Sequence, residues 1–214
     1  AGSNGGAVVF RELSTPMLDT CQFFTNHAEE NGGALYCDAE AAPSVRNCVM
    51  ASNSAGQYGG SFYCGAGISI EQCTIVNNRA PSGGAVYCEG EGAFMLTGNV
   101  LCGNDSVAVA APTAQFEPAL SHCLLYDNFG GDYLDKNVGP LMGAEAINAL
   151  PNNYQNAEGD PRFRAGPSGT WTAEPSYDAA TDTTALTDAA ADFAPDALAG
   201  RLIDSRDPDR LTHP

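Results

Sequence analysis

The chain has 214 residues, of which 26 are Asp or Glu and 9 are Lys or Arg, so its net charge is −17 at pH 7. A surface this acidic repels nucleic acid and anionic lipid headgroups, which excludes both as partners. No apolar run approaches the roughly 18 residues that a membrane-spanning helix needs, so no membrane span is predicted.

A six-residue phrase that begins with two glycines occurs four times in the first half of the chain. Its copies begin at Gly5, Gly32, Gly59 and Gly83, at intervals of 27, 27 and 24 residues. A nearly fixed period of this size indicates a repeat architecture, in which one unit is stacked several times.

A second phrase has the same period. A Cys stands five residues before an Asn, and an aliphatic residue stands three residues before that Cys; Asn99 takes the Cys place in the fourth copy. The two inward ladders that this predicts are Leu18, Val45, Ile70, Leu96 and Leu120, and Asn26, Asn53, Asn78, Asn104 and Asn128. Each Asn is expected to turn a corner, to tolerate left-handed dihedrals there and to bond the next turn through its amide.

Short apolar alternations broken by Gly, Asn and Ser predict strands of period two with tight corners. Such strands at a period near 25 residues predict an all-β fold, a parallel β-solenoid of about five turns over residues 1–138. Neighbouring turns are then about 4.8 Å apart, and equivalent residues stack. Residues 139–170 are predicted to form an irregular capping segment, and residues 171–214 a small, incomplete β module with strands near 176–178, 183–187 and 198–203.

The pairing of Gly-Gly-Ala-aliphatic with Phe23-Phe24-Thr25-Asn26 resembles the repeat of the chlamydial polymorphic outer membrane proteins. More widely, it resembles that of bacterial surface proteins with a right-handed parallel β-helix. The resemblance covers about residues 1–138, although only the first copy has Phe at the Phe-x-x-Asn position. It implies a right-handed β-helix that is secreted or displayed at a cell surface, as an adhesin or a carbohydrate-active rod.

Seven of the eight cysteines fall into two ladders. They are Cys21, Cys48, Cys73 and Cys123 in one, and Cys37, Cys64 and Cys88 in the other. No Cys-x-x-Cys motif occurs and no His lies at metal-ligand spacing, so neither a metal nor another cofactor is predicted. Two alternatives remain for the ladders: buried free thiols that fill small apolar spaces, which we favour, and disulfides between stacked neighbours.

One outward column carries charge. It consists of Asp19, Arg46, Glu71, Thr97 and Ser121. A lyase would need an Arg or Lys base here with calcium-binding carboxylates around it, whereas a structural column needs only alternating charge, and we favour the structural interpretation.

Two further groups of residues were candidates for chemistry. His27 and His122 lie at different points of the repeat, and we expect no Ser or Cys partner in matching register, so no catalytic triad is predicted. Asp127, Asp132 and Asp135 suggest a calcium site, but an acidic turn is the commoner meaning of such a cluster.

Tyr36, Tyr63 and Tyr87 form a third column. If the apolar residue before each Tyr points inward, the tyrosines form an exposed aromatic strip that stacks sugar rings or supports self-packing; with the opposite parity they belong to the core.

These features predict a non-enzymatic extracellular structural or adhesive β-solenoid, a cell-surface element or a subunit of a self-assembling fibre. The alternative is a carbohydrate-active enzyme, a polysaccharide lyase or glycosidase, which is disfavoured because residues 1–138 contain only four basic residues. The expected partners are further copies of the chain, joined head to tail by strand addition, and a glycan or cell surface.

Overall fold

The structure is a computed structural model, and it describes residues 3–113, 117–161, 176–178 and 183–185. The chain divides into two compact units, Ala1–Pro161 and Arg162–Pro214. In the second unit, β21 (Ser176–Asp178) and β22 (Thr183–Ala185) pair as an antiparallel hairpin, as the strand prediction for this region implies. The strand expected at 198–203 lies outside the described residues.

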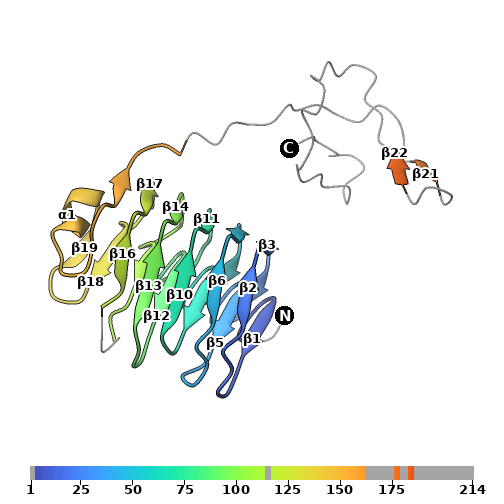
Figure 1. Ribbon diagram of the computed structural model, residues 1–214, viewed down its shortest axis with the longest axis horizontal. Helices are drawn as coiled ribbons and strands as arrows, with labels where there is room; N and C mark the ends of the chain where they lie inside the picture. The colour runs from blue at the N-terminus through green and yellow to red at the C-terminus, as the bar shows by residue number, and fades with distance from the viewer. Residues whose placement is uncertain (1–2, 114–116, 162–175, 179–182, 186–214) are drawn as a thin grey trace, which may run out of the picture. The chain divides into compact units, whose positions relative to one another are not determined.

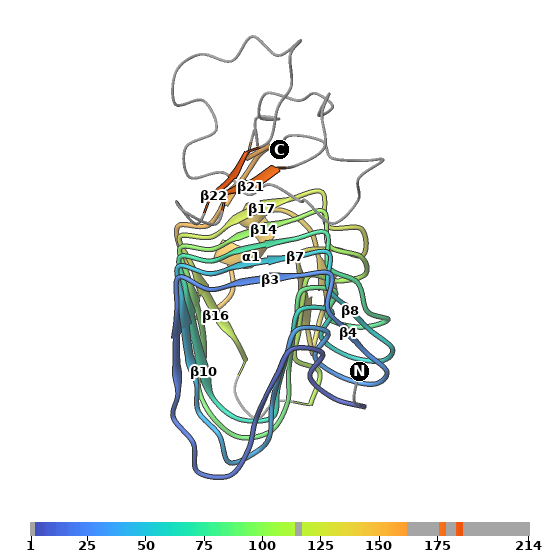
Figure 2. The same ribbon diagram turned by 90° about the vertical axis from the view of Figure 1, so that its right-hand side faces the viewer.

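The first unit is a β-solenoid whose coils lie side by side along one axis (Figure 1) and superimpose when viewed along it (Figure 2). Each of five coils adds one strand to each of three sheets. The first sheet contains β1 (Val8–Phe10), β5 (Leu35–Cys37), β9 (Phe62–Cys64), β12 (Val86–Cys88), β15 (Val109–Ala110), β18 (Tyr133–Asp135) and the antiparallel β19 (Gly139–Leu141).

The other two sheets are wholly parallel, and both are built from strands of two to four residues. The second sheet contains β2 (Met17–Asp19), β6 (Ser44–Arg46), β10 (Ile68–Glu71), β13 (Phe94–Thr97) and β16 (Ala119–Ser121); the third contains β3 (Gln22–Phe24), β7 (Val49–Ala51), β11 (Thr74–Val76), β14 (Val100–Cys102), β17 (Leu124–Tyr126) and β20 (Ala157–Glu158). A short pair, β4 (His27–Ala28) and β8 (Ser54–Ala55), follows the third sheet in the first two coils.

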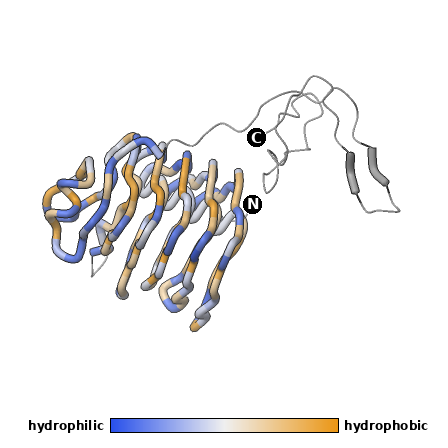
Figure 3. The backbone as a smooth tube through the Cα atoms, turned by 45° about the horizontal axis from the view of Figure 1, so that its top comes forward, coloured by the Kyte–Doolittle hydropathy of each residue, from blue (hydrophilic) through white to orange (hydrophobic). Residues whose placement is uncertain are grey.

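The predicted register is confirmed in the second sheet. Leu18 pairs with Val45, Val45 with Ile70, Ile70 with Leu96, and so on to Leu120. From Val45 onward these side chains are completely buried. Apolar and polar residues alternate along the coils (Figure 3). A three-residue strand therefore points either its middle side chain inward and the other two outward, or its middle side chain outward and the other two inward.

The glycine pairs form one corner in each of the first four coils, as predicted, and Ser106 (φ 60°) with Val107 takes their place in the fifth. A Cβ on Gly33 would lie 2.1 Å from the backbone oxygen of Gly60 in the next coil, and Gly32 has a positive φ of 66°. Only glycine allows the coils to approach this closely, which explains why the pair recurs in the sequence.

At the other two corners the structure corrects one expectation. The ladder asparagines do not adopt the left-handed conformation; the residue before each of them does, as Ser52 (φ 56°) and Asn77 (φ 53°) show. The corner between the second and third sheets is made in the same way by Asn47 and Gln72, each with φ 53°. The asparagine is therefore free to point inward, because its neighbour makes the turn.

Residues 133–161 continue the first unit beyond the five coils. β18 and β20 extend the first and third sheets, and the helix α1 (Ala144–Asn148) lies between β19 and β20 and buries Ile147 completely. Among the described residues, no helix is long and apolar enough to cross a membrane. The all-β solenoid of about five turns predicted from the sequence is thus confirmed.

Candidate functional site

The asparagine ladder lies at the corner after the third sheet and joins all five coils. Oδ1 of Asn53 accepts two hydrogen bonds from Asn26, one from the backbone N–H and one from Nδ2, each at 2.9 Å. The same pair of hydrogen bonds recurs between successive ladder residues up to Asn128. Nδ2 of Asn53 also donates to the carbonyl oxygen of Phe23 at 2.9 Å. The buried amides are therefore satisfied on both sides, and their role is structural.

The cysteine ladder makes equivalent hydrogen bonds between coils at the corner between the second and third sheets. The backbone N–H of Cys48 donates to Sγ of Cys73 at 3.4 Å, and the N–H of Cys73 donates to Oδ1 of Asn99 at 2.8 Å. The thiol of Cys48 in turn lies 3.1 Å from the carbonyl oxygen of Arg46. These thiols are free, as we favoured, and those of Cys48 and Cys73 also accept a hydrogen bond from the backbone N–H of the preceding coil, as Asn99 does.

The cysteines of the first sheet are completely buried, and all eight cysteines of the chain are free thiols. Sγ of Cys37 donates to the carbonyl oxygen of Ala41 at 2.9 Å. Burial raises the pKa of Cys64 and of Cys88, and it raises the pKa of Cys73 in the other ladder to about 12. These three thiols therefore stay protonated, which does not suit a nucleophile or a metal ligand. The hydrogen bond with Cys64 instead lowers the pKa of Cys37.

The outward charged column lies on the second sheet in the predicted register, and its members bond to one another. Nη2 of Arg46 lies 2.9 Å from Oδ2 of Asp19, and Nδ2 of Asn47 donates to the other carboxylate oxygen at 2.9 Å. These two hydrogen bonds, with that from Asn47 the larger effect, lower the pKa of Asp19. Farther along, Ser69 Oγ donates to Glu71 Oε1 at 2.6 Å. Arg46 is therefore paired with a carboxylate of the neighbouring coil, which is the arrangement expected of a structural column.

Of the two parities left open for the tyrosine column, the structure has the outward one, since the residues on either side of each Tyr are buried, but the column is not a fully exposed strip. The ring centroids of Tyr36 and Tyr63 are 5.0 Å apart with planes at 5°, and those of Tyr63 and Tyr87 are 5.8 Å apart at 7°. Tyr58 stacks on Tyr87, which is only 5% exposed. Because the rings cover one another's faces, those faces are not open to a sugar ring.

The aspartates suggested for calcium have other partners. Asp132 accepts hydrogen bonds from Asn128 Nδ2 and from the backbone of Gly143, both at 2.8 Å. Asp135 accepts from the backbone of Asn137 and Val138 at 2.8 and 2.7 Å. Both therefore hold the segment after the fifth coil in place. No group of three or more His, Cys, Asp or Glu residues that could hold a metal ion occurs in the described part of the chain.

The structure contradicts the expectation that His27 has no partner in register. His27 and Ser54 each follow a ladder asparagine, so they stack, and Nδ1 of His27 lies 2.9 Å from Oγ of Ser54. The sequence contained the signal, since both residues occupy the position after an Asn of the ladder. His122 instead packs edge-on against Tyr154, with ring centroids 5.5 Å apart.

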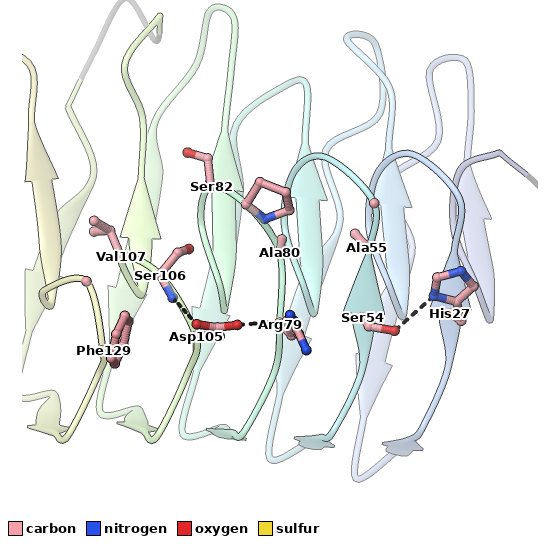
Figure 4. A pocket seen from close by; sticks show the side chains of 13 residues that line it. His27, Ser54, Ala55, Arg79, Ala80, Ser82, Asp105, Ser106, Val107 and Phe129 are labelled. Carbon is pink, nitrogen blue, oxygen red and sulfur yellow. Dashed lines mark hydrogen bonds and ion pairs between the residues drawn. The ribbon is translucent and has the colours of Figure 1, made fainter.

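This position opens onto a groove of about 700 Å³ that runs along the solenoid. It presents one residue from each coil in a single row (Figure 4), namely His27, Ser54, Arg79, Asp105 and Phe129. The floor is made of small residues two positions after each asparagine, Ala55, Ala80 and Ser106 among them. Because they leave the space above them empty, the corner is hollowed along its length.

The middle of the row carries an ion pair. Nε of Arg79 lies 3.1 Å from Oδ2 of Asp105, and Oδ1 of Asp105 accepts the backbone N–H of Ser106 at 3.0 Å. The side chains of Arg79 and Asp105 are 78% and 47% exposed, and Phe129 at the end of the row is 86% exposed. Arg79, Asp105 and Phe129 were not among the predicted site residues. This groove brings together an imidazole, a hydroxyl, an ion pair and a phenyl ring.

Residues 1–101 match the protein-family model described as "Right handed beta helix region". No curated protein and no solved structure is significantly similar to the chain. The stacked parallel coils and this match show that the first unit is a right-handed β-helix of repeated coils.

Proposed function

We propose that this protein is a non-enzymatic β-helix that serves as a structural or adhesive element at a cell surface or in an extracellular fibre. The observation that carries the proposal is the pairing of charge from coil to coil. Both Arg residues of the stacked columns have a carboxylate partner in an adjacent coil, Arg46 with Asp19 and Arg79 with Asp105. A lyase base has to be free to take a proton from its substrate, whereas each of these guanidinium groups lies against a carboxylate.

Three further features support a role as a rigid support. The ladder amides are satisfied inside the solenoid, the tyrosines stack on one another, and the thiols are free, six of the eight being buried. An acidic chain with a single Lys suits an environment outside the cell, where solubility matters. The narrower resemblance to the polymorphic outer membrane proteins points to the same location, which antibody labelling of intact cells would check.

The competing function is a polysaccharide lyase or glycosidase, and the groove beside the asparagine ladder is the feature that favours it. Arg79 and Asp105 lie there together in an exposed hollow, where a substrate could reach both. The two functions differ in one measurable property, which is whether a glycan is cleaved.

The test is incubation of the purified chain with a panel of neutral and acidic polysaccharides. Reducing ends report hydrolysis, and ultraviolet absorbance of unsaturated products reports elimination. We expect no product above a blank without protein, with or without calcium. Reproducible product that disappears in Arg79→Ala or Arg46→Ala would overturn the proposal in favour of the enzyme.

Head-to-tail association remains part of the proposal. In this chain β1, β2 and β3 are each an end strand of their sheet, and unpaired strand edges accept further strands. Light scattering over a wide range of protein concentration checks it: we expect the average mass to rise with concentration. A mass that stays at the monomer value would contradict association but would leave the non-enzymatic function standing.

A further inference from the structure

We propose that the groove beside the asparagine ladder binds a neutral saccharide chain that lies along the solenoid axis. This inference rests on the adhesive form of the proposed function and gives it a site and a ligand class. The groove presents one side chain per coil, so its five positions span about 19 Å at about 4.8 Å per coil. A hollow of this length fits an extended chain of several units better than a compact ligand.

The centre of the groove suits hydroxyl groups. The ion pair between Arg79 and Asp105 is made through Nε at 3.1 Å, and a guanidinium has four further N–H donors. Asp105 likewise has lone pairs beyond those used by Arg79 and Ser106. A hydroxyl both donates and accepts, so neighbouring sugar hydroxyls can donate to the carboxylate and accept from the guanidinium. The ion pair holds both groups in place before the ligand arrives, which lowers the entropy cost of binding.

The two ends of the row suit the C–H faces of sugar rings. Phe129 is 86% exposed, and its ring stands at the end of the polar row. At the other end, the ring of His27 is held by Ser54. An aromatic ring beside hydrogen-bonding groups is the combination that a pyranose requires, since the sugar has apolar faces and a polar rim.

Charge decides between neutral and ionic ligands. Among the described residues, Arg79 is the one Lys or Arg that lines the groove, and Asp105 neutralises it. The chain as a whole carries −17, so its field repels a polyanion. A cationic polymer would have to approach the guanidinium of Arg79 directly. An uncharged chain with many hydroxyls meets neither obstacle.

The experiment uses the whole chain and four neutral hexasaccharides, a glucan, a mannan, a galactan and a xylan, with a hexagalacturonate and a neutral hexapeptide as competitors of other classes. Calorimetry measures affinity, and ¹H–¹⁵N spectra report which residues respond. We expect at least one neutral hexasaccharide to bind and to shift the Arg79 Nε–H signal and the backbone signals of residues 54–56 and 105–107.

Variants locate the site. Phe129→Ala and Asp105→Ala change exposed side chains, so the solenoid should keep its melting temperature while affinity falls about tenfold or more. Tyr126→Ala is the matched control, because it removes another outward aromatic ring of the same coil that does not line the groove. It should leave the affinity unchanged.

Three outcomes would overturn the inference: no neutral hexasaccharide binds, the groove variants bind as well as the unaltered chain, or only the hexagalacturonate or the hexapeptide binds. Each of these leaves the non-enzymatic function untouched. Conversely, cleavage of a bound hexasaccharide would end the non-enzymatic proposal while supporting the groove as the binding site. The two proposals therefore fail separately.

Discussion

Asn53 donates two hydrogen bonds to a single atom of Asn78: Oδ1 of Asn78 accepts the backbone N–H of Asn53 at 2.9 Å and its Nδ2 at 3.0 Å. Both residues are completely buried. Two donors of one coil therefore depend on one atom of the next, and that atom has no substitute in the dry interior.

Replacement of Asn78 by Ala should therefore be strongly destabilising. It leaves both donors of Asn53 and the carbonyl oxygen of Met50 without their partner, and the unfolding free energy should fall by about 2 to 5 kcal/mol in urea denaturation. Asn26→Ala is the control at the end of the ladder, since no described residue donates to its Oδ1. A loss at position 26 as large as that at position 78 would contradict the ladder account.

The cysteine ladder predicts that Asn is tolerated better than Ala at a buried Cys position. Cys73→Ala removes the acceptor of the Cys48 N–H and should cost about 1 to 3 kcal/mol, again measured by urea denaturation. Cys73→Asn should cost less, because Asn99 already makes the equivalent bonds one coil away, accepting the N–H of Cys73 and donating to Ile70. If Asn proves worse than Ala at position 73, the thiol acts by its volume and not by its hydrogen bond.

The corner between the second and third sheets predicts opposite effects of two substitutions at equivalent positions of the repeat, Gly98 and Gln72. Gly98 has a φ of 67°, and a Cβ there would have room, its nearest neighbour being Gln72 at 3.6 Å. Gly98→Ala should therefore cost about 1 kcal/mol from backbone strain alone. Gln72 occupies the same corner one coil earlier with φ 53°, so Gln72→Gly should not destabilise the fold. Thr74→Gly, in a strand, is the control that should lower the melting temperature.

Alkaline pH should weaken the fold through its buried thiols. Burial raises the pKa of Cys73 to about 12, whereas a thiol in the unfolded chain ionises at about 8.5. The neutral thiol favours the folded state, so this contribution is complete below about pH 8.5 and is lost as the pH rises toward 12. Urea midpoints between pH 7 and 11 measure it. The decline should be shallower in Cys73→Asn; identical profiles would mean that this thiol does not contribute.

Asp19 should behave oppositely at acid pH. Its pKa is lowered by the hydrogen bonds from Asn47 and Arg46, so its stabilising effect is present at neutral pH and is lost as the pH falls below the ordinary carboxyl value. Asn47→Gly, which suits the left-handed corner, should raise the pKa of Asp19 in a carboxyl ¹³C titration. Arg79→Ala, at a distant corner, should leave it unchanged.

The repeat period by itself determined the architecture of the first unit. The strict offsets between Leu18, Cys21 and Asn26 and their copies fix the register, because a slip of one residue would turn every buried side chain toward water. For the same reason the sequence placed Asp19 and its column on the outside and aligned the glycine pairs where coils touch.

Only the tertiary structure decided what the outward columns do. The chain shows that His27 and Ser54, or Arg79 and Asp105, occupy equivalent places, but whether such neighbours bond depends on where the corner bends, and the bend is made by the residue before each asparagine. The same holds for the tyrosines, whose rings cover one another instead of facing solvent. The period determines which residues stack. Side-chain rotation then determines which stacked side chains contact one another, and the small floor residues Ala55 and Ala80 leave the space that forms the groove.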